Sequence, residues 1–309
     1  MGLYEGAIER VTALTKPVET RPHAAVAFLA AVPAIVMWGA TPAATAITVD
    51  EIDPLGAAVL RTLLAAVIVV PVALMLRLPL PRDRAQWGLL LMSGLGGFAG
   101  FTLLFSYGLS LTSTAHAALI LAGLPIVAGL GNALFDRRMP RVIWWIGISI
   151  AFAGEVLMIS SRDPGGQASL NGDLLCIAAM VCSGMGYVAG SRLTLKIGTW
   201  ATTFWGIGLA AVLQLPLLPW VIGGTEWATV SVAGWSGLGF LVIFSSVVGY
   251  CLWYWAMATG GVVRIAPIQF AQPVVSLVLA VALFNEAITV PIAVATVAIL
   301  AGIALARRG

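Results

Sequence analysis

Three ionisable side chains stand within apolar stretches of the sequence, where a charge is costly. Arg61, His116 and Glu155 each lie near one end of such a stretch, and charged groups inside a membrane usually pair with each other or mark a functional site. We expect all three in the outer third of the membrane. They could pair and fix the packing of helices, or they could bind a substrate carboxylate or carry a proton. Their residue types leave both alternatives open.

Aromatic and polar side chains form a second group of candidate functional residues. Aromatic rings can stack on a flat substrate side chain, and buried amides need hydrogen-bonding partners that a ligand can supply. A tryptophan in the middle of a span is either core packing or cavity lining. The candidate substrate-binding residues are Trp38, Thr41, Tyr107, His116, Tyr187, Tyr250, Gln269 and Gln272.

Prolines inside apolar stretches are candidate helix breaks. Pro42, Pro125 and Pro273 each stand within a long hydrophobic segment, and proline removes a backbone donor and clashes with the preceding turn. Discontinuous helices at these points would present freed carbonyl and N–H groups to a substrate. We therefore predict hinges at these three prolines.

These candidate residues lie on segments that are long enough to cross a membrane. The chain has 309 residues, of which 60% are hydrophobic and 9% charged, whereas soluble domains carry about 25% charged residues. Stretches of about 20 apolar residues predict membrane-spanning helices, and there is no strand-like alternation. The ten predicted spans are Ala24–Thr48, Leu55–Leu78, Ala85–Ser110, Ser113–Phe135, Val142–Ser160, Leu170–Leu195, Thr199–Ile222, Val230–Ala258, Gly261–Asn285 and Ile288–Ala306.

The positive charges predict the orientation of these spans. Of the 16 Lys and Arg residues, all but Arg61 and Arg162 fall on one side of the predicted membrane, and positive residues concentrate on the cytoplasmic side. This pattern predicts a multi-pass membrane protein with both termini in the cytoplasm. The expected location is the bacterial cell inner membrane.

The two halves of the chain carry the same pattern. Pro125 and Pro273 are 148 residues apart, and so are Gly154 and Gly302. Five spans precede the polar linker and five follow it, so the second repeat enters the membrane in the opposite sense. We expect a cytoplasmic tail over residues 1–23, a first five-helix repeat over 24–160, an outer linker over 161–169 and a second repeat over 170–309. The predicted fold is an all-α polytopic membrane protein with two inverted five-helix repeats around a central cavity.

Several function classes are disfavoured. Only two histidines occur, and the three cysteines lie within spans without the spacing of metal ligands. A nucleophile with a base and an orienting acid is not evident either, so we predict no enzyme, no metal and no cofactor. The net charge of +3 does not indicate nucleic-acid binding, because the positive residues lie beside the spans. The expected partners are a small-molecule substrate and membrane lipids, and the oligomeric state is not predicted.

A set of short motifs carries a family resemblance. The motifs are Trp38-Gly39, Asp53-Pro54 followed by Arg61, Pro125, Pro273, Asn285-Glu286 with Thr289, and Gly302. Together they resemble the drug/metabolite transporter superfamily in its ten-span EamA-type form, most similar to the YddG-type amino-acid exporters. The first repeat departs from the pattern at Asp136-Arg137-Arg138, where such repeats often have a glutamate. The resemblance implies a cavity lined by spans 1, 3, 4, 6, 8 and 9, peripheral spans 5 and 10, and a structural role for Glu155.

The function predicted from residues and resemblance together is export of small metabolites by alternating access. Amino acids, including aromatic ones, are the expected substrates. One alternative is an exporter of another small metabolite or drug, and another is a non-transporting membrane assembly subunit. Polar residues in the middle of spans argue against the assembly subunit, which has little use for them. Proton coupling is not determined by the sequence.

Overall fold

The computed structural model describes residues 24–49, 51–111, 120–121, 123–160, 169–272, 274–275, 290–306 and 308. Every regular element in these ranges is a helix, and none of the described residues forms a strand. The predicted all-α fold is therefore confirmed. His116, Pro273 and the segment containing Asn285, Glu286 and Thr289 lie outside the described residues.

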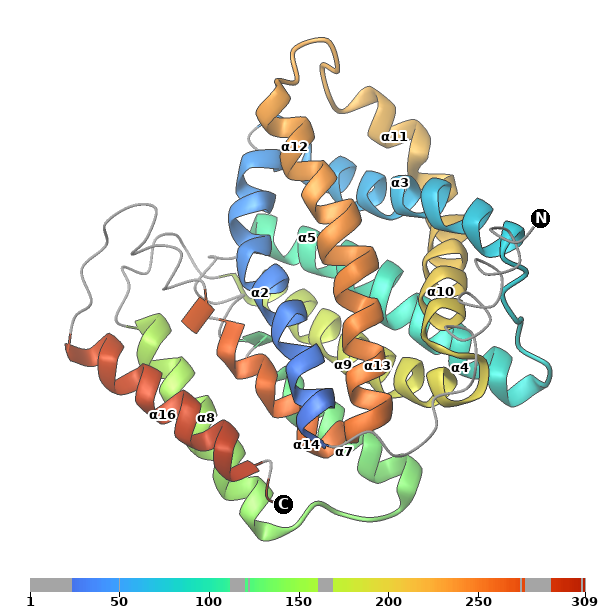
Figure 1. The fold of residues 1–309 in the computed structure, drawn as a ribbon. Coiled ribbons are helices and arrows are strands. Elements are labelled where there is room, and N and C mark those ends of the chain that lie inside the picture. The colour runs from blue at the N-terminus through green and yellow to red at the C-terminus, as the bar shows by residue number, and fades with distance from the viewer. Residues whose placement is uncertain are drawn as a thin grey trace, which may run out of the picture.

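The helices follow the order of the predicted spans (Figure 1). The first half contains α2 (Ala24–Val49), α3 (Pro54–Met75), α4 (Arg84–Ser93), η1 (Gly94–Gly100), α5 (Phe101–Leu111), α7 (Leu124–Asp136) and α8 (Val142–Ser160). The second half contains α9 (Leu170–Ile197), α10 (Thr199–Gln214), η2 (Leu215–Leu217), α11 (Leu218–Gly223), α12 (Val232–Phe240), η3 (Leu241–Val248), α13 (Gly249–Gly260), α14 (Val262–Ile265), η4 (Ala266–Ala271) and α16 (Val290–Ala306).

Five helices within the described residues are long and apolar enough to cross a membrane. They run over Pro54–Met75, Arg84–Gly108, Leu170–Ile197, Thr199–Gly223 and Val232–Gly260. Shorter apolar helices cover Ala25–Thr41, Leu124–Asp136, Val142–Leu157, Val262–Ala271 and Val290–Ala306. Each of these stretches overlaps one predicted span, and Leu124–Asp136 and Val262–Ala271 cover only part of the fourth and ninth predicted spans.

Local sequence explains where α3 begins and how the prolines act. The Asp53 side chain accepts hydrogen bonds from the N–H groups of Leu55 at 3.0 Å and Gly56 at 3.1 Å, which satisfies two unpaired donors at the helix start. Pro125 stands in the first turn of α7, where its missing N–H costs nothing. A new helix, α7, thus begins at Leu124, directly before Pro125.

The helix break predicted at Pro42 is wrong. α2 continues from Ala24 to Val49 without interruption. Proline removes only one backbone hydrogen bond, and in membrane helices side-chain hydroxyls and local adjustments compensate for such a loss.

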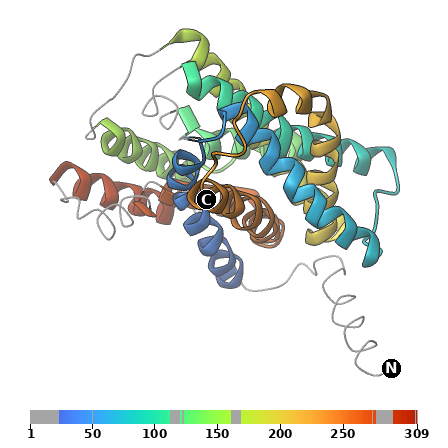
Figure 2. The ribbon, with the colours of Figure 1, turned by 90° about the horizontal axis from the view of Figure 1, so that it is seen from above.

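The fifth and tenth spans form a separate pair at the edge of the molecule. Figures 1 and 2 show α8 and α16 side by side at one edge of the bundle. They approach closely because small residues face each other: a Cβ at Gly147 would lie 2.7 Å from the Ala306 Cα. This is the peripheral arrangement that the resemblance implies.

The third and eighth spans each contain a π-helix in the middle. η1 lies between α4 and α5, and η3 lies between α12 and α13. The two segments occupy matching positions in the two halves, because Gly97 in η1 and Ser245 in η3 are 148 residues apart. π-Helical turns occur often at functional sites, and both of these contact aromatic rings in the centre of the molecule.

Candidate functional site

The centre of the molecule is a cluster of buried aromatic rings. Trp38 of α2 stacks on Tyr187 of α9, with ring centroids 5.8 Å apart and planes within 5°. The same indole meets Tyr250 and Trp253 of α13, each at 5.3 Å. Phe98 of η1 lies 4.2 Å from Tyr250. The cluster therefore joins one ring of the first span to rings of the sixth and eighth spans.

Glycines on neighbouring helices make room for these large rings. A Cβ at Gly249 would lie 2.8 Å from the Trp38 Nε1. A Cβ at Gly190 would overlap the ring of Tyr254, whose hydroxyl contacts Ser93 at 2.9 Å. The glycine-rich sequence of the sixth span thus serves the packing of aromatic side chains from the eighth.

Hydrogen bonds tie the cluster to the two π-helices. The Trp38 indole N–H donates to the Ser245 carbonyl at 2.9 Å. The Tyr250 hydroxyl donates to the Gly97 carbonyl at 2.7 Å. The Thr41 hydroxyl adds a contact with the Ser245 hydroxyl at 3.0 Å. Each π-helix therefore has one carbonyl that accepts a hydrogen bond from an aromatic side chain of the cluster.

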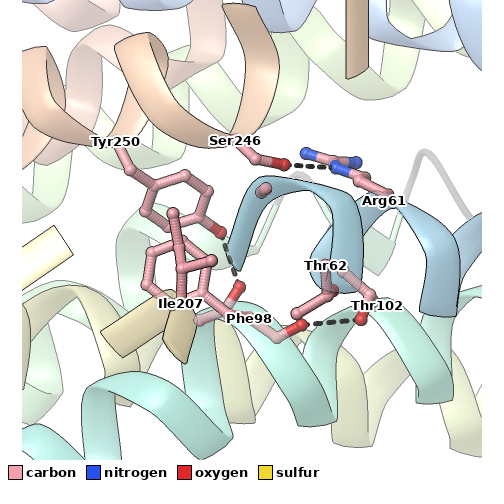
Figure 3. A pocket seen from close by; sticks show the side chains of 9 residues that line it. Arg61, Thr62, Phe98, Thr102, Ile207, Ser246 and Tyr250 are labelled. Carbon is pink, nitrogen blue, oxygen red and sulfur yellow. Dashed lines mark hydrogen bonds between the residues drawn. The ribbon is translucent and has the colours of Figure 1, made fainter. Parts of the chain in front are cut away.

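The side chain of Arg61, on α3, lies beside Ser246 of η3 and Tyr250 of the aromatic cluster (Figure 3). Its Nε donates to the Ser246 hydroxyl at 2.6 Å. One terminal nitrogen donates to the Ser245 hydroxyl at 2.8 Å. Among the residues that the structure describes, no carboxylate pairs with Arg61. The guanidinium charge is therefore oriented by two neutral hydroxyls within an apolar body.

Pairing of Arg61 with Glu155, part of one of the two alternatives that the sequence leaves open, does not occur, although the structure describes both residues. Glu155 lies on α8, in the peripheral pair, where it is 6% exposed and its Oε2 has no hydrogen-bonding partner in the described part of the chain. Similar depth did not bring the two residues together, because their helices belong to different parts of the bundle.

The void between Arg61 and the aromatic cluster is small. A void of about 10 Å³ is lined by Arg61, Gly97, Phe98, Ser246 and Tyr250, among others. One water molecule needs about 10–15 Å³ on this measure. The void beside Arg61 and Tyr250 therefore has room for about one water, and the rings of Phe98 and Tyr250 beside it lie close together.

Two buried polar atoms in the cluster lack partners among the described residues. The Gln269 amide nitrogen donates to the Tyr187 hydroxyl at 3.2 Å, while its carbonyl oxygen Oε1 has no donor. The indole N–H of Trp253 has no acceptor. Because unsatisfied buried polar groups are costly, this donor and this acceptor are candidates for binding a ligand.

The structure gathers most of the predicted site residues that it describes. Trp38, Thr41, Tyr187, Tyr250 and Gln269 meet in or beside the cluster. Gln272 is partly buried, and its backbone carbonyl lies near Gly39.

Tyr107 does not join this group. It lies on α5, near the end of the third span, and is 57% exposed. That it lines the same site as Trp38 stays a prediction.

Sequence reasoning missed Trp253 and the two serines of η3. Trp253 lies three residues after Tyr250 on the same helix, a spacing that places both rings on one face. That spacing was a usable signal. Ser245 and Ser246 gave only a weak one, because two hydroxyls in an apolar span are common and their partners lie far away in sequence.

Comparisons with known proteins agree with this architecture. Residues 25–160 and 170–308 each match the EamA-like transporter family. The uncharacterized transporter YdeK of Bacillus subtilis (strain 168) is 29% identical over 275 residues, or 89% of this chain and 94% of the relative. The uncharacterized inner membrane transporter YedA of Escherichia coli (strain K12) is 26% identical over 264 residues, or 82% of this chain and 81% of the relative. A crystal structure is similar with a TM-score of 0.76 at 23% identity, covering 91% of this chain and 96% of that one.

The family match covers nearly the whole chain and occurs twice. It confirms that the chain is a polytopic membrane protein with an internal repeat and a transporter rather than an enzyme. The names of these relatives specify no substrate. On the strength of the repeated match, this chain belongs to the EamA-like transporter family.

Proposed function

We propose that this transporter exports amino acids, including aromatic ones, across the bacterial inner membrane by alternating access. The substrate would bind in the aromatic cluster, where Trp38 of the first repeat meets Tyr187, Tyr250 and Trp253 of the second. Transporters of repeated architecture commonly bind their substrates near mid-membrane at the interface of the two repeats. The location of the cluster supports this assignment.

The observation that carries the proposal is the unpaired charge of Arg61. Its guanidinium lies beside Tyr250 and is held only by the hydroxyls of Ser245 and Ser246 among the described residues. A guanidinium binds a carboxylate through charge-assisted hydrogen bonds. An amino-acid carboxylate would supply the missing counter-charge, which a neutral drug would not.

The remaining groups of an amino acid also have complementary partners. The rings of Trp38, Tyr187 and Tyr250 provide faces and edges for an aromatic or apolar side chain. The free oxygen of Gln269 is an acceptor for an ammonium group. Because the void beside Arg61 has room for about one water, entry of a substrate there requires these rings to separate.

Hydrogen bonds between the two repeats support a conformation of the transporter that is closed on the side predicted to be outside. The α2–α3 connection contacts the α11–α12 connection through Glu51 and Ser231, and through the Asp53 N–H and the Thr225 hydroxyl at 3.2 Å. These connections lie on the side predicted to be outside. Alternating access would require these contacts to break when the transporter opens outward.

Transport by purified protein in liposomes tests the proposal. We expect Arg61→Gln to lower phenylalanine flux by about tenfold or more, because truncating one member of a buried charge pair is costly, and Arg61→Lys to retain part of it. Arg82→Gln, which removes the same charge from an exposed position in the α3–α4 connection, is the control. Phenethylamine, which lacks the carboxylate, should compete poorly with phenylalanine in the wild type.

Two outcomes would overturn the proposal. Equal flux in the Arg61→Gln and Arg82→Gln variants would remove Arg61 from the site. Competition by phenethylamine as strong as that by phenylalanine would show that the carboxylate is not recognised, and another class of metabolite or drug would then be the substrate.

A further inference from the structure

A second site candidate lies far from the aromatic cluster, in a cleft on the side predicted to be cytoplasmic. The cleft has a volume of about 520 Å³ and is formed where the α7–α8 connection passes α14. Its lining includes Asn132, Asp136, Arg138, Arg141 and Arg264. Volumes of 300–1,000 Å³ are typical of ligand pockets.

The walls of this cleft are fixed by the fold. Arg137 adopts a left-handed conformation, with φ of 53°, and turns the chain away from α7. The Trp144 indole N–H of α8 donates to the Val263 carbonyl of α14 at 2.9 Å. This bond connects the peripheral α8–α16 pair to the central helices directly beside the cleft.

The charge in the cleft is positive. Of the described residues that line it, Asp136 alone carries a carboxylate, and Arg192 of α9 neutralises this group at 2.6 Å. Arg138, Arg141 and Arg264 are exposed and have no carboxylate partner in the described part of the chain. Arg141 also immediately precedes α8, and the N-terminus of a helix carries a partial positive charge. An anion in the cleft would balance these charges.

The surroundings of the arginines are apolar and exposed. Leu134 is 73% exposed, Met139 67% and Val142 74%. Such side chains, next to arginines at the ends of membrane helices, are suited to lipid tails, while the arginines reach the phosphate level of the bilayer. A free anion would gain nothing from this apolar border, whereas a phospholipid would use both parts.

We propose that this cleft binds the head group of an anionic phospholipid of the inner leaflet. Basic pockets between membrane helices on the cytoplasmic side suit such head groups. The phosphate would contact Arg138, Arg141 and Arg264, and the acyl chains would lie along Leu134, Met139 and Val142. The lipid would thereby bridge α7, α14 and the start of α8, and hold the peripheral pair against the central helices.

Lipid retention by the purified full chain tests this proposal. Native mass spectrometry in a mild detergent measures how many phosphatidylglycerol and phosphatidylcholine molecules remain bound after both are supplied equally. We expect the wild type to prefer phosphatidylglycerol, and the R138Q/R141Q/R264Q variant to lose this preference by about fivefold per arginine, as expected from about 1 kcal/mol for each positive side chain near a membrane.

The control variant is R77Q/R82Q/R84Q. It removes Arg77 and Arg82 from the α3–α4 connection and Arg84 from the start of α4, on the same predicted side of the membrane but outside the cleft. We expect it to keep the wild-type preference. If it loses as much preference as the cleft variant, the attraction is a general effect of positive charge and the proposal is wrong.

Competition by inorganic phosphate and a single variant, R264Q, provide two further tests of the lipid site. Inorganic phosphate that displaces phosphatidylglycerol at equimolar concentration would indicate a site for a free anion instead of a lipid. Should the triple variant not fold, R264Q alone, on the opposite wall of the cleft, should reduce the preference by about fivefold. An unchanged preference in folded R264Q would overturn the assignment.

Discussion

The two repeats use the same helix pair in opposite ways. In one pair, α9 of the second half packs on η1 of the first half through backbone: a Cβ at Gly186 would lie 2.5 Å from the Gly97 nitrogen. In the matching pair, α2 of the first half packs on η3 of the second half. The residue that corresponds to Gly186 is Trp38, and its indole fills the space beside η3 and donates to the Ser245 carbonyl. Trp38 and Gly186, like Gly97 and Ser245, are 148 residues apart. One interface is therefore sealed by glycine and the other is filled by a ring.

This difference suggests which interface changes during transport. Backbone packed directly on backbone has no side chain that can rotate away, so the α9–η1 contact should persist as a rigid unit. A single indole held by one hydrogen bond and by ring contacts has a side chain that can rotate, so we expect the α2–η3 contact to be the adjustable one. The proposed substrate site includes this indole and therefore lies at the adjustable interface.

The largest effect should come from adding a methyl group to the sealed interface. We expect Gly186→Ala to destabilise the protein by about 1–3 kcal/mol or more, because overpacking against backbone cannot be relieved by rotating a side chain. Gly239→Ala is the matched control, since nothing lies within 4 Å of a Cβ at that helical glycine. Thermal unfolding in detergent measures both, and equal melting temperatures would show that the α9–η1 interface is not tightly sealed.

A smaller effect is expected from the ring-filled interface. Trp38→Phe removes the donor to the Ser245 carbonyl, and a typical hydrogen bond contributes about 1 kcal/mol. Trp253→Phe makes the same change of ring size in the same cluster, but its indole N–H has no partner among the described residues. Trp38→Phe should therefore be the less stable variant by about 1 kcal/mol in equilibrium unfolding. The reverse order would mean that the bond to η3 does not hold the indole.

Much of this architecture is readable from the sequence, because it rests on length and repetition. Ten apolar stretches and a constant offset of 148 residues predict the helices and the internal repeat. The same offset aligns Trp38 with Gly186. The offset reveals that the two interfaces differ, but only the coordinates reveal that one is closed by glycine and the other by an indole.

Features that depend on local register and on helix neighbours could not be predicted from the sequence. A π-helical turn adds a residue to the turn and rotates the rest of the helix, so an apolar pattern does not reveal that Ser245 and Ser246 face Arg61. The position of Glu155 along its span indicates its depth, but depth does not specify which helices touch. The proline pattern predicts a break at Pro42, which one missing hydrogen bond is too weak to cause.

The smallest effect concerns the ends of the same two helix pairs, which also differ. Beyond α2, the Glu51 carboxylate accepts hydrogen bonds from the hydroxyl and backbone N–H of Ser231. The matching positions in the other half are Thr199 and Asp83, and the Thr199 hydroxyl has no partner among the described residues. The α2–η3 interface is thus followed by the Glu51–Ser231 hydrogen bonds, called the tie below, and the matching residues beyond the α9–η1 interface form no such bonds among the described residues.

This tie should make stability depend weakly on pH. The hydrogen bonds from the side chain and then the backbone of Ser231 hold the pKa of Glu51 below its ordinary value of 4.5. A lowered folded-state pKa stabilises the protein above the unfolded-state pKa, and this contribution is lost as pH falls through the folded-state value. We expect the melting temperature of the wild type to fall more than that of Glu51→Gln between pH 6 and values below about 4. Ser231→Ala should also show a smaller fall in melting temperature than the wild type over this pH range. Parallel pH profiles for all three proteins would show that the Glu51–Ser231 hydrogen bonds do not form in the purified protein.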